Sequence, residues 1–221
     1  MLYLASSSPR RSQLLRLGGW TFKVIPAHID ESLLSGEEAR AYVTRLASEK
    51  ARAVGAGLEA GLVLAADTIV VDGYDEEQTI LGKPRTPQEA EWMLRRLRGH
   101  SHRVMTGLAV LDVSHSELIS DCCETRVPMR EYSEAEMAAY VASGDPFDKA
   151  GAYAIQHAGF HPVESLEGCF ANVMGLPLCH VGRILESLGL PPVEGLAAIC
   201  QTELDTTCSL QEQVMAGKSI G

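Results

Sequence analysis

Runs of β-forming apolar residues alternate with capped helical segments along most of this chain, and no other feature limits the fold so strongly. Strands are predicted at 2–5, 21–26, 62–66, 68–72, 79–81, 102–113 and 117–130, with two more near 151–155 and 162–166. Alternation of strands and helices is typical of proteins in which helices cover a sheet. We therefore expect an α/β fold.

Short polar residues mark where four of the predicted helices begin. A proline at the first helical position suits the fixed backbone angle of that residue, and a serine followed three residues later by glutamate forms a capping box. The starts of the first kind are Ser8-Pro9 and Thr86-Pro87, and those of the second are Ser35 with Glu38 and Ser133 with Glu136. A last helix is expected at about 177–188.

The chain changes character after Pro191-Pro192, where the sequence becomes more polar and predicts one short helix. We therefore expect a main domain at residues 1–190 and a C-terminal tail at residues 191–221 with no assigned role.

The net charge of −10 makes some classes of binding partner unfavourable. An acidic surface disfavours binding to nucleic-acid polymers, which depends on neutralising phosphates, but it leaves room for a small basic pocket. No apolar run approaches the roughly 18 residues of a membrane span, and the first apolar run is too short for a signal peptide. We expect a cytoplasmic protein with reduced cysteines, or alternatively a disulfide between Cys200 and Cys208.

Two arginines occupy an unusual place at the start of the first predicted helix. In LASSSPRRSQLL, Ser8 suits the N-cap and Pro9 the first helical position, so Arg10 and Arg11 fall in the first turn. A helix N-terminus already carries about half a positive charge, and each cation placed there costs about 0.3–1 kcal/mol. A bound anion would remove this cost. The pattern predicts either a phosphate-binding site or two exposed arginines in a surface turn.

A lysine and an aspartate each interrupt an apolar pattern. Lys50 lies in the stripe that the second helix is expected to bury, together with Ala39, Val43, Leu46 and Val54. Its ammonium either reaches water along the apolar face or points into a cleft that holds an anion. Asp67 stands in the strand-like run LVLAADTIVVDG, where an isolated charge is costly to bury. It either caps backbone at a bulge or serves as a metal ligand or general base at a strand end.

Further charged residues lie in short motifs. Lys83 is in the turn LGKPRTP, and Asp148 and Lys149 precede a small-residue run that ends at Gln156. Taken singly, each is better explained as part of an ordinary charged turn. Together with the residues above and Glu31, they supply cations that bind phosphates and carboxylates that hold a hard divalent metal. Both are requirements of phosphate-ester chemistry.

These motifs, in this order, resemble the Maf family of nucleoside triphosphate pyrophosphatases. The matching segments are LASSSPRRSQLL, DES, SEKA, AADTIV, GKP, VMTG, DKAGAYAIQ and NVMGLPL, over about residues 2–188. The resemblance implies an α/β fold with a strongly bent mixed sheet, flanked by helices, and two lobes around a central cleft. It also implies hydrolysis of a nucleoside triphosphate to the monophosphate and pyrophosphate with Mg²⁺ or Mn²⁺, as house-cleaning of the nucleotide pool. Members are often dimers, so a homodimer is among the expected states.

The resemblance assigns roles to individual residues. It implies that Asp67 is the catalytic proton acceptor and that the phosphates are bound by Ser8, Arg10, Arg11, Lys50 and Lys83. We expect the metal to be held by Glu31, Asp67 and Asp148.

The chain resembles the branch of the family that acts on dTTP and UTP at three positions, namely Arg11, Thr68 and Gln156. That branch has a doubled arginine after the proline, a threonine after the aspartate and an Ile-Gln pair, all of which occur in this chain. At the position of Ala154 that branch usually has glycine, so this chain departs from the pattern there. From the three shared features we expect dTTP or UTP as the substrate, with modified nucleotides included. The alternative is a nucleotide-binding regulator of septum formation and cell division with little catalysis.

Overall fold

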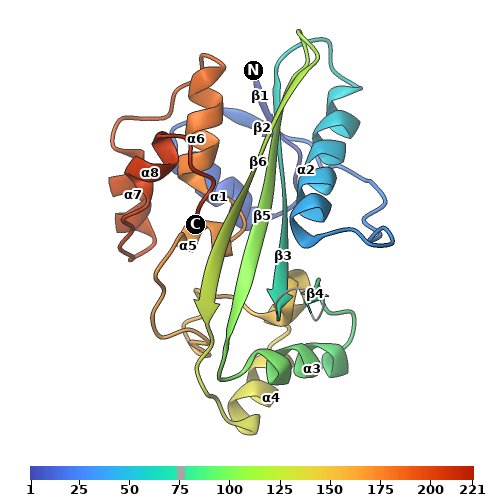
Figure 1. Cartoon of the computed structure of the whole chain (residues 1–221), viewed down its shortest axis with the longest axis vertical. Helices are drawn as coiled ribbons and strands as arrows, with labels where there is room; N and C mark the ends of the chain where they lie inside the picture. Colours follow the sequence, from blue (N-terminus) through green and yellow to red (C-terminus); the bar gives the residue numbers. More distant parts are fainter. Residues whose placement is uncertain (74–77) are drawn as a thin grey trace. The chain divides into compact units, whose positions relative to one another are not determined.

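The computed structural model of the chain describes residues 1–73 and 78–221 and contains a six-stranded mixed sheet flanked by helices (Figure 1). Its strands are β1 (Leu2–Leu4), β2 (Phe22–Val24), β3 (Leu62–Asp72), β4 (Thr79–Leu81), β5 (Ser101–Asp112) and β6 (Glu117–Pro128). They follow the order β2-β1-β3-β5-β6, with β4 beside β3. β1 is parallel to β2 and β3, whereas β4 is antiparallel to β3. The predicted α/β fold with a mixed sheet is therefore confirmed.

The helices are α1 (Pro9–Leu17), α2 (Ala39–Gly55), α3 (Pro87–Leu97), α4 (Glu134–Ala142), α5 (Phe170–Val173), α6 (Leu178–Ser187), α7 (Leu196–Glu203) and α8 (Gln211–Met215). Two short 3₁₀ helices, Asp145–Asp148 and Ala150–Ala152, lie between α4 and α5 in the chain. Among the described residues, no helix combines the length and the apolar character that crossing a membrane requires.

The chain forms two compact units. Unit 1 comprises residues 1–68, 105–124 and 168–221, and unit 2 comprises residues 69–104 and 125–167. Each unit is therefore assembled from segments that are distant in sequence, and β3, β5 and β6 contribute residues to both.

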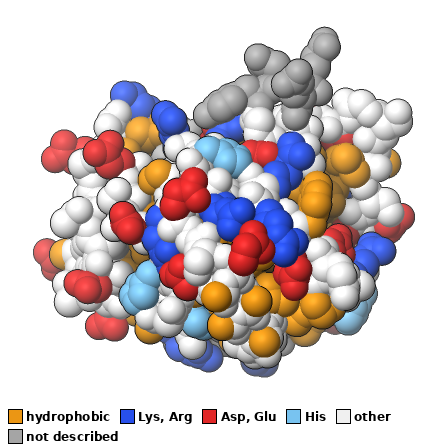
Figure 2. All heavy atoms as spheres, turned by 90° about the horizontal axis from the view of Figure 1, so that it is seen from below, with side chains coloured by type: hydrophobic (Ala, Val, Ile, Leu, Met, Phe, Trp, Pro, Cys, Tyr) orange, Lys and Arg blue, Asp and Glu red, His pale blue; other side chains and the backbone are white. Residues whose placement is uncertain are grey.

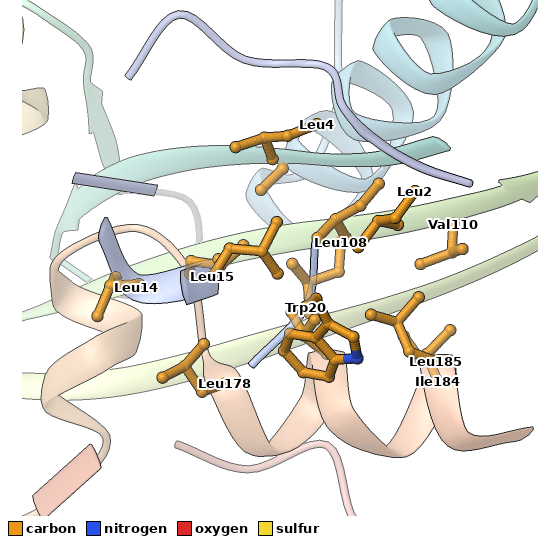
Figure 3. Packing of buried hydrophobic residues seen from close by; sticks show 14 of the residues in the cluster. Leu2, Leu4, Leu14, Leu15, Trp20, Leu108, Val110, Leu178, Ile184 and Leu185 are labelled. Atoms are coloured by element: carbon orange, nitrogen blue, oxygen red, sulfur yellow. The ribbon is translucent and has the colours of Figure 1, made fainter. Parts of the chain in front are cut away.

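An apolar cluster forms the core of unit 1 (Figure 3). Leucines of β1 and α1 meet Trp20 and side chains of β5 and α6, and the cluster includes Leu2, Leu4, Leu14, Leu15, Leu108, Val110, Leu178, Ile184 and Leu185. The Trp20 indole N–H donates to the Leu190 carbonyl at 3.1 Å. Burial of one such side chain stabilises the fold by about 1.5–3 kcal/mol. The cluster therefore fixes β1 and α1, and with them the serine-rich turn between the two elements.

The start of α2 differs from its prediction. Glu38 is the N-cap residue, and the Ser35–Glu38 capping box is wrong because Glu38 makes no cap hydrogen bond within residues 1–73 and 78–221. Its neighbour Glu37 instead accepts from the Leu34 N–H at 3.2 Å and from Arg45 Nε at 2.6 Å. This ion pair with the second turn of α2 fixes the preceding loop.

Helices α3 and α4 of unit 2 begin as predicted. The Thr86 side chain accepts a backbone N–H at the start of α3, and Ser133 and Glu136 form a reciprocal capping box at the start of α4. Figure 2, turned by 90° from the view of Figure 1, shows basic and acidic side chains intermixed on one face. An ion pair links α3 and α4, because Arg95 Nη2 lies 2.9 Å from Glu134 Oε2.

The strands predicted near 151–155 and 162–166 are wrong. Gly151 has φ 69° and Ala152 has φ 62°, which are left-handed values incompatible with a strand, and the chain here forms a 3₁₀ turn. Residues 162–166 also form no strand, although the Pro162 carbonyl accepts from the Arg130 N–H at 3.0 Å. A run of small residues satisfies a strand pattern and a tight turn equally well, which explains the error at 151–155.

The last 31 residues, 191–221, form two helices where the sequence predicts one. Leu196 and Ala197 of α7 and Val214 of α8 are buried, and both helices pack on α6 of unit 1. The boundary at residue 190 stays a prediction. Cys200 and Cys208 are free thiols, so the structure does not contain the alternative disulfide between them.

A buried carboxylate on β6 holds the end of this tail. Asp121 Oδ2 accepts from His180 Nδ1 at 2.7 Å and from Arg183 Nη2, and Asp121 Oδ1 accepts from the Ser219 hydroxyl. His180 Nε2 in turn lies 2.8 Å from the Ile220 carbonyl oxygen. The Asp121 and His180 side chains are only 7% and 1% exposed, so this pair is shielded from water, whereas Ser219 is exposed.

Candidate active site in unit 1

The N-terminus of α1 places two cations beside backbone N–H groups. Ser8 is the N-cap residue, Pro9 is the first helical residue, and Arg10 and Arg11 follow in the first turn, as predicted. Among the described residues, the Ser8 hydroxyl makes no cap hydrogen bond, while its backbone N–H donates to Ser6 Oγ at 3.2 Å. The first turn, residues 9–12, contains no acid to balance the cations. Such an end of a helix is suited to bind an anion.

Arg11 is held inside unit 1 by contacts along its whole guanidinium. Nε donates to the Gly175 carbonyl at 2.9 Å, Nη2 donates to Thr68 Oγ1 at 3.0 Å, and Nη1 donates to Ser6 Oγ at 3.4 Å. Burial lowers the pKa of Arg11, and the charge of the Asp67 carboxylate partly offsets this effect. The alternative of a fully exposed arginine in a surface turn is therefore wrong for Arg11.

Lys50 of α2 lies between two carboxylates. Its Nζ is 2.6 Å from Asp67 Oδ1 and 2.6 Å from Glu31 Oε1. Lys50 is 8% exposed, so the alternative in which its ammonium reaches water is wrong. Asp67 is equally buried and lies within the continuous strand β3, so the alternative of a capping aspartate at a bulge is also wrong. The Glu31 side chain, in contrast, is 55% exposed.

Tyr42 of α2 fixes the loop that carries Glu31. Its hydroxyl donates to the Glu31 backbone carbonyl at 2.6 Å. Burial raises the pKa of Tyr42, and the negative charges of Asp67 and Glu31 raise it further. The phenol therefore stays protonated and keeps Glu31 near Lys50.

The carboxylates of this site partly meet the needs of a metal ion. Within residues 1–73 and 78–221, no group of three or more His, Cys, Asp or Glu side chains is arranged to hold a metal. Glu31 and Asp67 bring two carboxylates to one ammonium. Mg²⁺ usually takes one or two protein carboxylates together with phosphate oxygens of the substrate. The donor set therefore suits a metal that binds together with a phosphate ligand.

The remaining predicted site residues lie in unit 2. Lys83 is exposed in the turn between β4 and α3, and Gln156 is exposed in a loop. Asp148 ends a 3₁₀ helix, and its Oδ1 accepts from Lys149 Nζ at 2.6 Å. Lys149 also donates to Asp145 Oδ1 at 3.0 Å. The roles predicted for Lys83, Asp148 and Gln156 stay predictions.

Sequence reasoning missed Ser6, Thr106 and Gly175. Thr106 Oγ1 lies 3.0 Å from Thr68 Oγ1. Gly175 has φ +103°, and a Cβ at this position would come within 3.2 Å of Thr68 Oγ1, so only glycine lets the chain pass so close to Arg11 and Thr68. The motifs VMTG and NVMGLPL, which contain Thr106 and Gly175, were the available signal for these two residues.

Comparisons with known proteins identify the family of this chain. The sequence model of the family described as "Maf-like protein" matches residues 1–188. A protein of Dehalococcoides mccartyi named "dTTP/UTP pyrophosphatase" is 40% identical, over 94% of this chain and 95% of its own length. Proteins with the same name from Myxococcus xanthus and Geotalea uraniireducens are 47% and 45% identical, over 86% and 85% of this chain and 94% and 95% of their own lengths.

Proposed function

The chain belongs to the Maf family, and on that premise we propose that it hydrolyses dTTP or UTP to the nucleoside monophosphate and pyrophosphate. The relatives that carry the name "dTTP/UTP pyrophosphatase" support this proposal. We further propose that the protein works on free nucleotides in the cytoplasm. A homodimer and the inclusion of modified nucleotides stay predictions.

The contact of Lys50 with Asp67 and Glu31 is the observation that carries the proposal. A buried lysine and a buried aspartate on neighbouring elements meet an exposed glutamate in the same unit as the cationic N-terminus of α1. Phosphate binding needs the cations, and activation of water needs a carboxylate. The structure supplies both within unit 1.

Each residue of this cluster has a distinct chemical task in the proposed reaction. Arg10, Arg11 and the N–H groups of the first turn bind the triphosphate. Asp67 orients or deprotonates the water that attacks the α-phosphorus, and pyrophosphate leaves. Negative charge shifts toward the leaving pyrophosphate during the reaction, and the Lys50 ammonium compensates this charge. Because Lys50 already donates to Asp67, it also holds the carboxylate in one orientation.

Glu31 and Asp67 are the residues of unit 1 that would hold Mg²⁺ or Mn²⁺, with phosphate oxygens completing the ligand set. When bound, the ion would supply charge stabilisation at the phosphate oxygens. Glu31 is well placed for this task because more than half of its side chain is exposed and can exchange its partner. Asp148 as a third ligand, Lys83 as a phosphate ligand and Gln156 as a specificity residue are part of the proposal by resemblance.

The purified protein should release pyrophosphate from dTTP and UTP in the presence of Mg²⁺ or Mn²⁺. The measurement is a panel of nucleoside triphosphates with detection of pyrophosphate and of inorganic phosphate. Asp67→Asn should lower kcat by about a thousandfold, within the range for loss of a general base or of a metal-binding carboxylate. Absence of pyrophosphate from every triphosphate would overturn the proposal.

Asp72→Asn is the matched control. Asp72 lies on the same strand, is 6% exposed and pairs with Arg96 and His100 of unit 2. The proposal gives it no chemical role, so its variant should retain kcat after correction for the folded fraction. Equal loss of activity in both variants would show that any buried charge on β3 is needed, which contradicts a special role of Asp67.

A further inference from the structure

A chain of hydrogen bonds runs from Arg11 through two threonines to the backbone. Arg11 Nη2 donates to Thr68 Oγ1 at 3.0 Å, and Thr68 Oγ1 lies 3.0 Å from Thr106 Oγ1. Thr106 Oγ1 in turn donates to the Asn172 carbonyl at 3.2 Å. All of these residues belong to unit 1.

The direction of this chain follows from counting protons. A guanidinium only donates and a carbonyl only accepts, whereas each threonine hydroxyl has a single proton. Thr106 uses its proton on the Asn172 carbonyl, so it must accept in its contact with Thr68. Thr68 therefore gives its proton to Thr106 and accepts from Arg11. The hydroxyl of Thr68 has no proton left for a ligand.

Thr106 itself cannot touch a ligand in this position. Its residue is 0% exposed, whereas Thr68 is half-buried. The close approach of Gly175, whose Cβ would lie 3.2 Å from Thr68 Oγ1, further limits how the Thr68 side chain can turn. Thr106 therefore acts on the site only through Thr68.

We propose that Thr106 is a positioning residue for nucleotide selection, because it fixes the Thr68 hydroxyl as a hydrogen-bond acceptor toward the base. This inference rests on the proposed function and on the specificity role that the family resemblance predicts for Thr68. An acceptor at Thr68 matches the N3–H donor that uracil and thymine share. It does not match the unprotonated N3 of cytosine, which is itself an acceptor. A site built for one partner rejects the analogue that leaves its polar group unpaired.

Thr106→Val removes the acceptor for the Thr68 proton while keeping the side-chain shape. The freed Thr68 hydroxyl can then rotate and donate to cytosine. We expect the ratio of kcat/KM for UTP to that for CTP to fall by about tenfold, which corresponds to the net worth of one hydrogen bond in a recognition site. The change should appear mainly in KM, since Thr106 does not contact the reacting phosphates.

Thr106→Ser is the matched control, because it keeps the hydroxyl and should keep the UTP to CTP ratio within twofold of the parent. Thermal unfolding of both variants reports any general loss of stability. Such a loss would lower kcat/KM for UTP and for CTP equally and leave their ratio unchanged. An unchanged ratio in Thr106→Val, with the parent active on UTP, overturns the inference. A parent that releases no pyrophosphate from UTP or dTTP would instead overturn the proposed function.

Discussion

Asp67 on β3 and Asp121 on β6 are both buried aspartates of unit 1, yet their surroundings differ. At Asp67, two carboxylates share one ammonium, and the second carboxylate, Glu31, is 55% exposed. At Asp121, a single carboxylate meets His180, Arg183 and the Ser219 hydroxyl. The first cluster has an excess of acid, and the second has an excess of base.

On our proposal, this difference separates a catalytic cluster at Asp67 from a structural network at Asp121. Both oxygens of Asp121 are occupied by hydrogen-bond partners, and one of these partners, His180, is 1% exposed. Such a saturated network stabilises the structure and offers nothing to a ligand. In the Asp67 cluster an exposed carboxylate can leave Lys50 and bind a cation instead. Burial of a carboxylate is therefore a weaker guide to function than the exposure of its partners.

The largest stability effect should follow Asp121→Asn. It removes the charge that compensates His180 and Arg183, and breaking a buried ion pair typically costs about 3–5 kcal/mol. We expect the free energy of unfolding, measured by urea titration, to fall by about 3 kcal/mol. The kcat of the folded protein should stay within twofold of the parent. A loss of kcat with unchanged stability would reverse the roles that we assign to the two aspartates.

Asp67→Asn should have a smaller effect on stability, although we expect it to remove most of the activity. Lys50 keeps Glu31 as a partner at 2.6 Å, so its charge is not left alone. We expect the free energy of unfolding to change by about 1 kcal/mol or less, since a partner charge remains. The same urea titration measures this value. A loss equal to that of Asp121→Asn would mean that the two clusters are equally structural.

A still smaller effect on stability is expected when the pH is lowered. Burial alone would raise the pKa of Asp121, but hydrogen bonds from His180 and Ser219 outweigh it and hold the pKa well below its usual value of 3.8. A carboxyl whose pKa is lowered by folding stabilises the protein above its usual pKa and loses that contribution as the pH falls. The difference in unfolding free energy between the parent and Asp121→Asn should therefore shrink below about pH 3.8. A constant difference from pH 6 to pH 3 would contradict this account of the network.

The parts of the fold that local sequence determines were predictable. The Thr86 cap, the Ser133–Glu136 box and the stripe containing Lys50 depend on residues three or four apart, and the structure contains all of them. The Ser35–Glu38 box failed because α2 begins at Ala39, which makes Glu38 itself the N-cap residue, and Glu37 rather than Glu38 pairs with the helix through Arg45. Local spacing cannot rank such competing contacts.

Long-range contacts of the site were only partly predictable. Lys50 and Asp67 attract notice because charge is unexpected in an apolar pattern, and the structure joins them. Thr106 carries no charge, and apart from its place in the motif VMTG one threonine in a buried strand attracts no notice. Its role depends on Asn172, which is 66 residues away in sequence.

The origin of the oxygen in the products tests the central claim most directly. UTP should be hydrolysed in ¹⁸O-labelled water with Mg²⁺, and the products should be analysed by mass spectrometry. If water attacks the α-phosphorus, one labelled oxygen appears in UMP and the pyrophosphate is unlabelled. Label in the pyrophosphate, or release of inorganic phosphate in its place, would contradict the account.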